Sequence, residues 1–226
     1  MPRHWDLFVF DWDGTVMDST GAIVRAAERA IADTGLPERP PDRIREIIGL
    51  GLRESWDWLF PDQGVESFGE FVESYRTHFV ERERHTIRPY PGVERVLGGL
   101  RDDGAILAVA TGKSRIGLDH DFQHSGLGEL FEHSVTVDET RSKPHPEMLI
   151  SVMSYLGVEP ARTLMIGDTE FDLQMARAAG TDAVGVAWGA HDRRRLLDQM
   201  PLTCLDRLTD LPAWLEHFEA EMDQCL

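Results

Sequence analysis

The stretch LFVFDWDGT, residues 7–15, joins an apolar run to two carboxylates that stand two positions apart. An apolar run without polar alternation is typical of a strand that is buried on both faces of a parallel sheet. In an extended backbone, residues i and i+2 point to the same side, so Asp11 and Asp13 can face one ligand. A simple Asp-Gly turn with solvated carboxylates is the alternative. The stretch therefore predicts a core strand that ends in a candidate site.

Similar apolar runs recur along the chain and alternate with helical patterns, which indicates an α/β fold with a parallel sheet covered by helices. The expected strands cover residues 7–10, 106–110, 134–137, 163–166 and 183–186. The expected helices between them cover residues 92–104, 114–126, 145–157 and 171–180. Glycines close these helical patterns, as is common at helix C-termini.

Residues 18–88 have a different pattern, which is helical throughout and contains no convincing strand. A helical insertion after the first strand explains this pattern. The segment RPYPGV, residues 88–93, is expected to be the stiff return hinge, because its prolines restrict the backbone around Tyr90. We therefore expect a core domain of residues 1–17 and 89–226, and a helical cap domain of residues 18–88.

The amino-acid composition limits the kinds of molecule that this protein is expected to bind. A chain of 226 residues can bury a sizeable core. Its formal net charge of -17 disfavours nucleic acid and anionic membrane surfaces, which are bound mainly by clustered Lys and Arg. No stretch has the pattern of a secretory signal or the length of a membrane span, so we expect a cytoplasmic protein. An anionic substrate would need a local positive charge, and a bound divalent cation is the simplest source.

Three further features are interpreted as ordinary rather than functional. Cys204 and Cys225 lack any zinc-site spacing and are expected to be free thiols, with a disulfide between them as the alternative. His120 and His124 have the i, i+4 spacing of a helical metal site, but no acidic third ligand supports one, so a solvated or packed helix face is preferred. The run RRR at residues 193–195 is interpreted as a surface charge cluster.

Polar residues follow the expected strands, and in open parallel sheets ligands bind beyond the carboxyl ends of the strands. After the second long strand, Thr111 and Gly112 offer a hydroxyl and backbone N–H groups to an anion. Helix capping by Thr111 or Ser114 is the alternative. Lys143 precedes Pro144, which we expect to start a helix and to restrict the Lys143 backbone.

A further buried strand leads into Gly167, Asp168 and Asp172, which repeats the design of the first strand end. Either aspartate could also cap the following helix. Taken together, the strand ends provide two pairs of aspartates, a Thr-Gly and a lysine. This is the set of groups that is needed to bind a metal and a phosphoryl group.

With these motifs in this order, the chain resembles the haloacid dehalogenase-like hydrolase superfamily, in its phosphoglycolate-phosphatase-like branch. The matching residues are DWDGT at 11–15, Thr111 in VATGKS, Lys143 in SKPHP, and GDTEFD at 167–172. The resemblance covers essentially the whole chain. It implies a Rossmann-like parallel sheet flanked by helices, with an inserted all-helical cap of the C1 type that acts as a lid over the active site.

The resemblance also implies roles for the matching residues. Asp11 would be the nucleophile that forms an aspartyl-phosphate, and Asp13 would be the general acid and base. Mg²⁺ would be held by the Asp11 carboxylate, the Asp13 backbone carbonyl and Asp168. Asp172 would orient this metal shell, directly or through water.

Thr111, the Gly112 amide and Lys143 would bind the phosphoryl oxygens. The implied activity is the hydrolysis of a small phosphorylated metabolite such as phosphoglycolate. A phosphomutase of the same branch, which differs in how the cap excludes water, is one alternative, and a non-catalytic phosphoryl-binding module is another. A dehalogenase is disfavoured, because it has no need for a general acid at Asp13.

Substrate choice is expected to lie in the cap. The family places its specificity loop near residues 48–55, where Arg53 would reach an anionic group of the substrate and Arg45 is a weaker candidate. A simple helix connection with surface arginines is the alternative. Residues 54–60 are expected to pack within the cap, and Trp12 is expected to pack beside the first strand or at the cap hinge.

Overall fold

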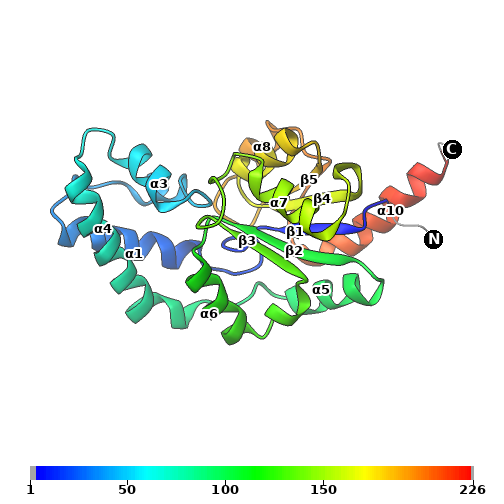
Figure 1. The fold of residues 1–226 in the computed structure, drawn as a ribbon, viewed down its shortest axis with the longest axis horizontal. Helices are drawn as coiled ribbons and strands as arrows, with labels where there is room; N and C mark the ends of the chain where they lie inside the picture. The colour runs from blue at the N-terminus through cyan, green and yellow to red at the C-terminus, as the bar shows by residue number, and fades with distance from the viewer. Residues whose placement is uncertain (1–3, 225–226) are drawn as a thin grey trace.

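The computed structural model describes residues 4–224, and a six-stranded parallel sheet lies at its centre (Figure 1). The strands are β1 (Leu7–Phe10), β2 (Ile106–Thr111), β3 (His133–Thr136), β4 (Thr163–Gly167), β5 (Asp182–Val186) and β6 (Thr203–Leu205). Their order in the sheet is β3-β2-β1-β4-β5-β6. The order reverses between β1 and β4, and in such sheets the ligand crevice lies beyond the carboxyl ends at this reversal.

Successive side chains of each strand enter two different cores, because side chains alternate across a strand. On one face, Phe8 and Phe10 of β1 pack with residues of α5, α6 and α10, and on the other, Leu7 and Val9 pack with residues of α7, α8 and α9. These helices are α5 (Val93–Asp102), α6 (Arg115–Ser125), α7 (Glu147–Leu156), α8 (Glu170–Ala179), α9 (Arg193–Leu197) and α10 (Leu211–Gln224). Both faces of the sheet are therefore covered, which explains the continuous apolar strands.

A helical insertion, residues 20–86, follows β1 and lies to the left of the sheet in Figure 1. It consists of α1 (Thr20–Asp33), α2 (Pro41–Arg45), α3 (Leu52–Leu59), α4 (Val65–His78), a π-helical turn (Phe79–Glu83) and a 3-10 turn (Arg84–Thr86). The insertion has a hydrophobic core of its own, in which Trp56 of the 54–60 segment packs against Phe60 and Phe71. Where the insertion begins and ends, Met17 and Pro89 form an isolated antiparallel bridge.

The expected strands are found to within one residue at each end, and β6 was not predicted. This edge strand is three residues long and has no apolar run that could reveal it. The expectation that Pro144 starts a helix is wrong, because α7 begins at Glu147 with Pro146 at its N-cap. Lys143 therefore lies in a turn that precedes the helix by several residues.

The features interpreted as ordinary have ordinary contacts. The rings of His120 and His124 stack with centroids 3.7 Å apart, and neither histidine belongs to a possible metal-binding group among the described residues. Arg193 pairs with an exposed aspartate, at 2.6 Å. Cys204 is a buried free thiol, whereas Cys225 lies outside the described residues. Within residues 4–224, no helix has the length and apolar character needed to cross a membrane.

Candidate active site

Asp11 directly follows β1 and is buried next to Lys143. The Lys143 ammonium donates a hydrogen bond of 2.6 Å to Asp11 Oδ1 and lies 2.7 Å from Asp172 Oδ1. Burial by itself lowers the pKa of Lys143, but Asp11 and Asp172 outweigh burial and raise the pKa above its ordinary value. Lys143 is therefore a fixed positive charge between two carboxylates.

Asp168 directly follows β4, and close contacts surround its carboxylate. The Thr15 hydroxyl donates to Oδ1 at 2.8 Å, and the Ala190 backbone N–H donates to Oδ2 at 2.7 Å. A Cβ atom on Gly14 or on Gly189 would lie within 2.2 Å of Oδ2, so both backbones approach Asp168 as only glycine can. These contacts fix the position of the Asp168 carboxylate.

Asp172 serves both of the purposes that the sequence left open. Its Oδ2 accepts a hydrogen bond from the Thr169 N–H at 3.0 Å and its own N–H donates to the Thr169 hydroxyl oxygen at 3.4 Å, which together form a capping box at the start of α8. The Thr169 hydroxyl also lies 2.7 Å from Oδ2. Asp172 Oδ1 faces Lys143. The helix cap thus aims the second oxygen of Asp172 at the site.

Asp11, Asp168 and Asp172 each offer one oxygen atom, and these three atoms lie within 4.8 Å of one another. Burial raises the pKa of Asp11 well above its ordinary value, and Lys143 only partly opposes this. Burial and Asp172 raise the pKa of Asp168 to about 6. Asp11 Oδ2 is buried and has no hydrogen-bond partner among residues 4–224. Because one ammonium does not balance three carboxylates, this set of hard oxygen ligands fits a divalent cation such as Mg²⁺.

Thr111 and Gly112 lie at the end of β2, on the side of the sheet that faces the helical insertion. The Thr111 hydroxyl accepts a hydrogen bond from the Lys113 N–H at 3.1 Å, while Ser114 provides the side-chain cap of α6. A Cβ atom on Gly112 would lie 2.5 Å from the Gly49 carbonyl oxygen. Glycine at this position therefore allows the turn after β2 to touch the insertion.

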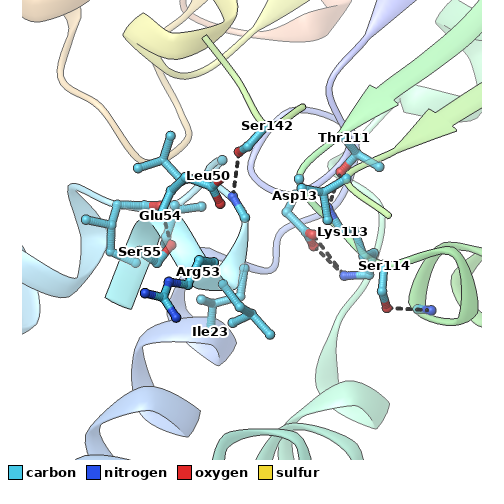
Figure 2. A pocket seen from close by; sticks show the side chains of 18 of the residues that line it. Asp13, Ile23, Leu50, Arg53, Glu54, Ser55, Thr111, Lys113, Ser114 and Ser142 are labelled. Carbon is cyan, nitrogen blue, oxygen red and sulfur yellow. Dashed lines mark hydrogen bonds and ion pairs between the residues drawn. The ribbon is translucent and has the colours of Figure 1, made fainter. Parts of the chain in front are cut away.

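Asp13 is held by Lys113, a residue to which the sequence analysis gave no role. The Lys113 ammonium lies 2.9 Å from both carboxylate oxygens of Asp13 (Figure 2) and 3.2 Å from Asp121 Oδ2. The Trp12 indole N–H donates to the same oxygen of Asp121 at 3.1 Å. Trp12 packs beside the first strand, as expected, but its contact with Asp121 was missed. The position of Lys113 directly after the Thr111-Gly112 pair was the available signal.

A cavity of about 910 Å³ lies between these strand ends and the helical insertion. Asp11, Asp13, Thr111 and Gly112 line it from the sheet side, while Lys143, Asp168 and Asp172 do not line it. Its walls on the insertion side include Leu50, Arg53, Tyr75, Arg76, Phe79 and Arg84. The cavity therefore gives access to Asp11 and Asp13 from the side of the insertion.

The two candidate arginines of the insertion have different positions. Arg53 lines the cavity, but its guanidinium pairs with Asp57 at 3.2 Å and points away from Asp13 in Figure 2. Arg45 does not line the cavity, and it contacts the Thr20 hydroxyl at 3.4 Å. Arg53 is thus the better placed of the two for contact with a substrate.

Comparison with known proteins agrees with this fold. Residues 8–186 match the family model of the haloacid dehalogenase-like hydrolases. The chain is 32% identical over 219 residues to the phosphoglycolate phosphatase of Aquifex aeolicus, covering 95% of this chain and 99% of that protein. It is 33% identical over 186 residues to the N-acetylmuramic acid 6-phosphate phosphatase of Pseudomonas aeruginosa, covering 80% and 81%.

A solved structure of a predicted phosphoglycolate phosphatase from Haemophilus somnus has the same fold, with a TM-score of 0.84 at 24% identity over 94% of this chain and 99% of that chain. The chain belongs to the haloacid dehalogenase-like hydrolases, in their phosphoglycolate-phosphatase-like branch. Its enzyme class is that of a phosphoric monoester hydrolase. The family expected from the motifs is therefore confirmed.

Proposed function

We propose that this enzyme hydrolyses a small phosphorylated metabolite, such as phosphoglycolate, with Mg²⁺ and through a phosphoryl group carried by Asp11. The observation that carries the proposal is the buried Asp11 carboxylate at the base of the cavity. Lys143 holds its Oδ1, while its Oδ2 has no hydrogen-bond partner. One oxygen is thus oriented, and the other is available.

In the first half of the reaction, an Asp11 oxygen attacks phosphorus and the ester P–O bond breaks. Asp13 gives a proton to the departing alkoxide. The Thr111 hydroxyl, the Gly112 N–H and Lys143 bind the phosphoryl oxygens and stabilise charge in the transition state. Mg²⁺, held by Asp11, Asp168 and Asp172, would supply the positive charge that offsets the phosphate and the carboxylates.

In the second half, water attacks the phosphorus of the aspartyl-phosphate while Asp13 removes a proton from this water. The bond from phosphorus to Asp11 breaks, inorganic phosphate forms, and Asp11 returns to a carboxylate. Asp13 needs access to both the leaving group and water. Its position on the cavity wall, two residues after Asp11 in the chain, supports this double role.

The helical insertion is proposed to act as the cap, with residues 18–88 as the cap domain and residues 1–17 with 89–226 as the core domain. Closure over a substrate would bring Arg53 toward an anionic group, in exchange for its pairing with Asp57. Two named relatives act on esters of different size, phosphoglycolate and N-acetylmuramic acid 6-phosphate. A cavity of about 910 Å³ has room for either.

The test is phosphate release from a panel of phosphorylated metabolites, with Mg²⁺ and with a chelator in its place. Turnover by the wild type is expected to require Mg²⁺ and to fall to background in Asp11→Asn. The matched control, Asp198→Asn, changes an exposed aspartate of the surface and is expected to leave turnover unchanged.

Activity close to wild type in Asp11→Asn would overturn the nucleophile assignment. An isomeric phosphate ester without free phosphate would identify a phosphomutase. Binding of a phosphate ester without any reaction would identify a binding module.

A further inference from the structure

The sequence contains 23 lysines and arginines, and two of these residues are lysines, Lys113 and Lys143. Both lysines are buried beside Asp11 and Asp13, the first two carboxylates of the site. Lys143 already has a role in phosphoryl binding. Lys113 has none, although it is one of the two lysines of the sequence.

The Lys113 ammonium donates two hydrogen bonds to Asp13 and forms an ion pair with Asp121. An ammonium has three N–H donors. The Lys113 nitrogen has three carboxylate oxygens around it, Asp13 Oδ1 and Oδ2 at 2.9 Å each and Asp121 Oδ2 at 3.2 Å. Its side chain is 8% exposed. Because both oxygens of Asp13 contact one buried cation, rotation of the Asp13 carboxylate is restricted.

Asp121 is in turn fixed to the backbone that carries Asp13. Trp12, the residue between Asp11 and Asp13, donates its indole N–H to Asp121 Oδ2, and its ring packs against Phe122. Trp12 contacts Asp121, Asp121 contacts Lys113, and Lys113 contacts Asp13, which follows Trp12 in the chain. These four residues form a closed ring of contacts. Trp12 anchors this ring of contacts in a hydrophobic core of the sheet.

The helical insertion contacts the same group of residues at Lys113. The ring centroid of Phe79, in the π-helical turn after α4, lies 5.2 Å from the Lys113 ammonium. This distance allows a cation–π contact. Burial by itself lowers the pKa of Lys113, but Asp13 and Asp121 outweigh burial and raise it, so the ammonium keeps its charge.

On the basis of the proposed function, we propose that Lys113 is a positioning residue for Asp13 in the hydrolysis of the aspartyl-phosphate, and that Asp121 holds Lys113 in place for this task. In that step, the bond from water oxygen to phosphorus forms and the bond from Asp11 to phosphorus breaks. The proton of the water passes to Asp13. A carboxylate with both oxygens oriented meets this water in one geometry, and Lys113 supplies that orientation.

The kinetic test uses Lys113→Met with p-nitrophenyl phosphate, whose leaving group departs without a proton. The value of kcat/KM reports the steps up to and including phosphoryl transfer to Asp11. It is expected to stay within about threefold of wild type. The value of kcat includes the hydrolysis step and is expected to fall about tenfold to a hundredfold, part of the usual effect of a general base. A burst of nitrophenolate equal to the enzyme concentration is expected to precede the slow phase.

Two further variants separate positioning from general damage. Lys113→Arg retains a cation that can bind a carboxylate through two N–H groups and is expected to recover part of kcat. Arg177→Met replaces an exposed cation of α8 and is expected to leave both constants unchanged. An equal loss of kcat and kcat/KM in Lys113→Met, or no loss, would overturn the positioning role. Absence of turnover in the wild type, or full turnover in Asp11→Asn, would instead overturn the proposed function.

A spectroscopic test does not depend on turnover. Protein labelled with ¹⁵N at lysine side chains has two ammonium signals, because the sequence has two lysines. The conservative Asp121→Asn variant is expected to shift one signal and leave the other in place, and Asp13→Asn is expected to shift the same signal. If the two variants shift different signals, or neither shifts any, the shared contact is excluded and the proposal fails.

Discussion

The two lysines occupy comparable corners of one site, and each lies between two aspartates. Lys143 bridges Asp11 and Asp172, and its side chain has no exposed surface. Lys113 bridges Asp13 and Asp121, but it lines the cavity and lies beneath a ring of the helical insertion. The Lys143 corner is therefore built from the end of β1, the turn that carries Lys143 and the first turn of α8, whereas the Lys113 corner is completed by the insertion.

This difference separates two requirements of the site. The Lys143 corner contains an excess of buried negative charge, since one ammonium meets the three carboxylates of Asp11, Asp168 and Asp172. In the Lys113 corner, Asp13 and Asp121 both contact the Lys113 ammonium, and Asp13 and Lys113 line the cavity. The excess of negative charge thus lies deep in the core, and Asp13, the proposed general acid and base, lies at the cavity wall.

The largest effect is expected from Lys143→Met, which removes the cation from the fully buried corner. Removal of one partner of a buried ion pair costs about 3–5 kcal/mol, because the remaining charges lose their partner. Lys113→Met is expected to cost less, since Asp13 can turn toward water in the cavity. Denaturant unfolding of both variants measures the comparison, and equal losses of unfolding free energy would contradict it.

A second effect concerns pH and Mg²⁺ at Asp168, whose pKa is raised to about 6 from an ordinary value of 3.8. Below about pH 4, Asp168 is protonated in both the folded and the unfolded protein, so the stabilisation that its raised pKa gives to the folded protein is fully present. It is lost as pH rises through the folded value of about 6. Metal-free protein is therefore expected to lose a few kcal/mol between pH 4 and pH 7.5.

Mg²⁺ is expected to raise Tm more at pH 7.5 than at pH 5, because protons compete with the metal for the same carboxylates. Asp168→Asn serves as the control and should reduce both the pH dependence and the response to Mg²⁺. Thermal unfolding with and without Mg²⁺ at the two pH values provides the measurement. A response to Mg²⁺ that is equal at both values would argue against a metal at these carboxylates.

A smaller effect is expected at Phe79, where the insertion meets the Lys113 corner. Phe79→Leu keeps an apolar side chain but removes the ring from above the ammonium, which costs about 1 kcal/mol. We expect kcat to fall by about fivefold, which corresponds to that energy. The same change at Phe68, whose ring faces Arg53 in the insertion, is the matched control and should leave kcat closer to wild type.

The smallest effect is expected at the contact between the loop of residues 48–51 and the sheet side of the site. The Gly51 N–H donates to Ser142 Oγ at 2.8 Å, and Figure 2 shows this contact as a dashed line at Ser142. Ser142→Ala removes this acceptor, at a cost of about 1 kcal/mol. Looser docking of the loop is expected to raise KM by a few-fold while kcat stays nearly constant. An unchanged KM would show that this link does not affect substrate binding.

Particular elements show which parts of the fold and of the site could be predicted from the sequence. The five longer strands were predicted to within a residue, because continuous apolar runs identify strands buried on both faces. The edge strand β6 and the start of α7 were missed, since a three-residue strand and a turn between two prolines carry no periodic signal. Asp11, Thr111, Lys143, Asp168 and Asp172 could be grouped in advance, because parallel strands bring their carboxyl ends to one edge.

The sequence by itself determined the strand ends, the motif residues at them and the family to which the chain belongs. The tertiary structure decided which charges meet. Lys113 and Asp13 are 100 positions apart, and Trp12 and Asp121 are 109 positions apart. Local patterns describe the backbone around each residue, but the pairing of distant side chains depends on how α6 and the helical insertion pack against the end of β1. The partner of Asp13 was therefore visible only once the chain was folded.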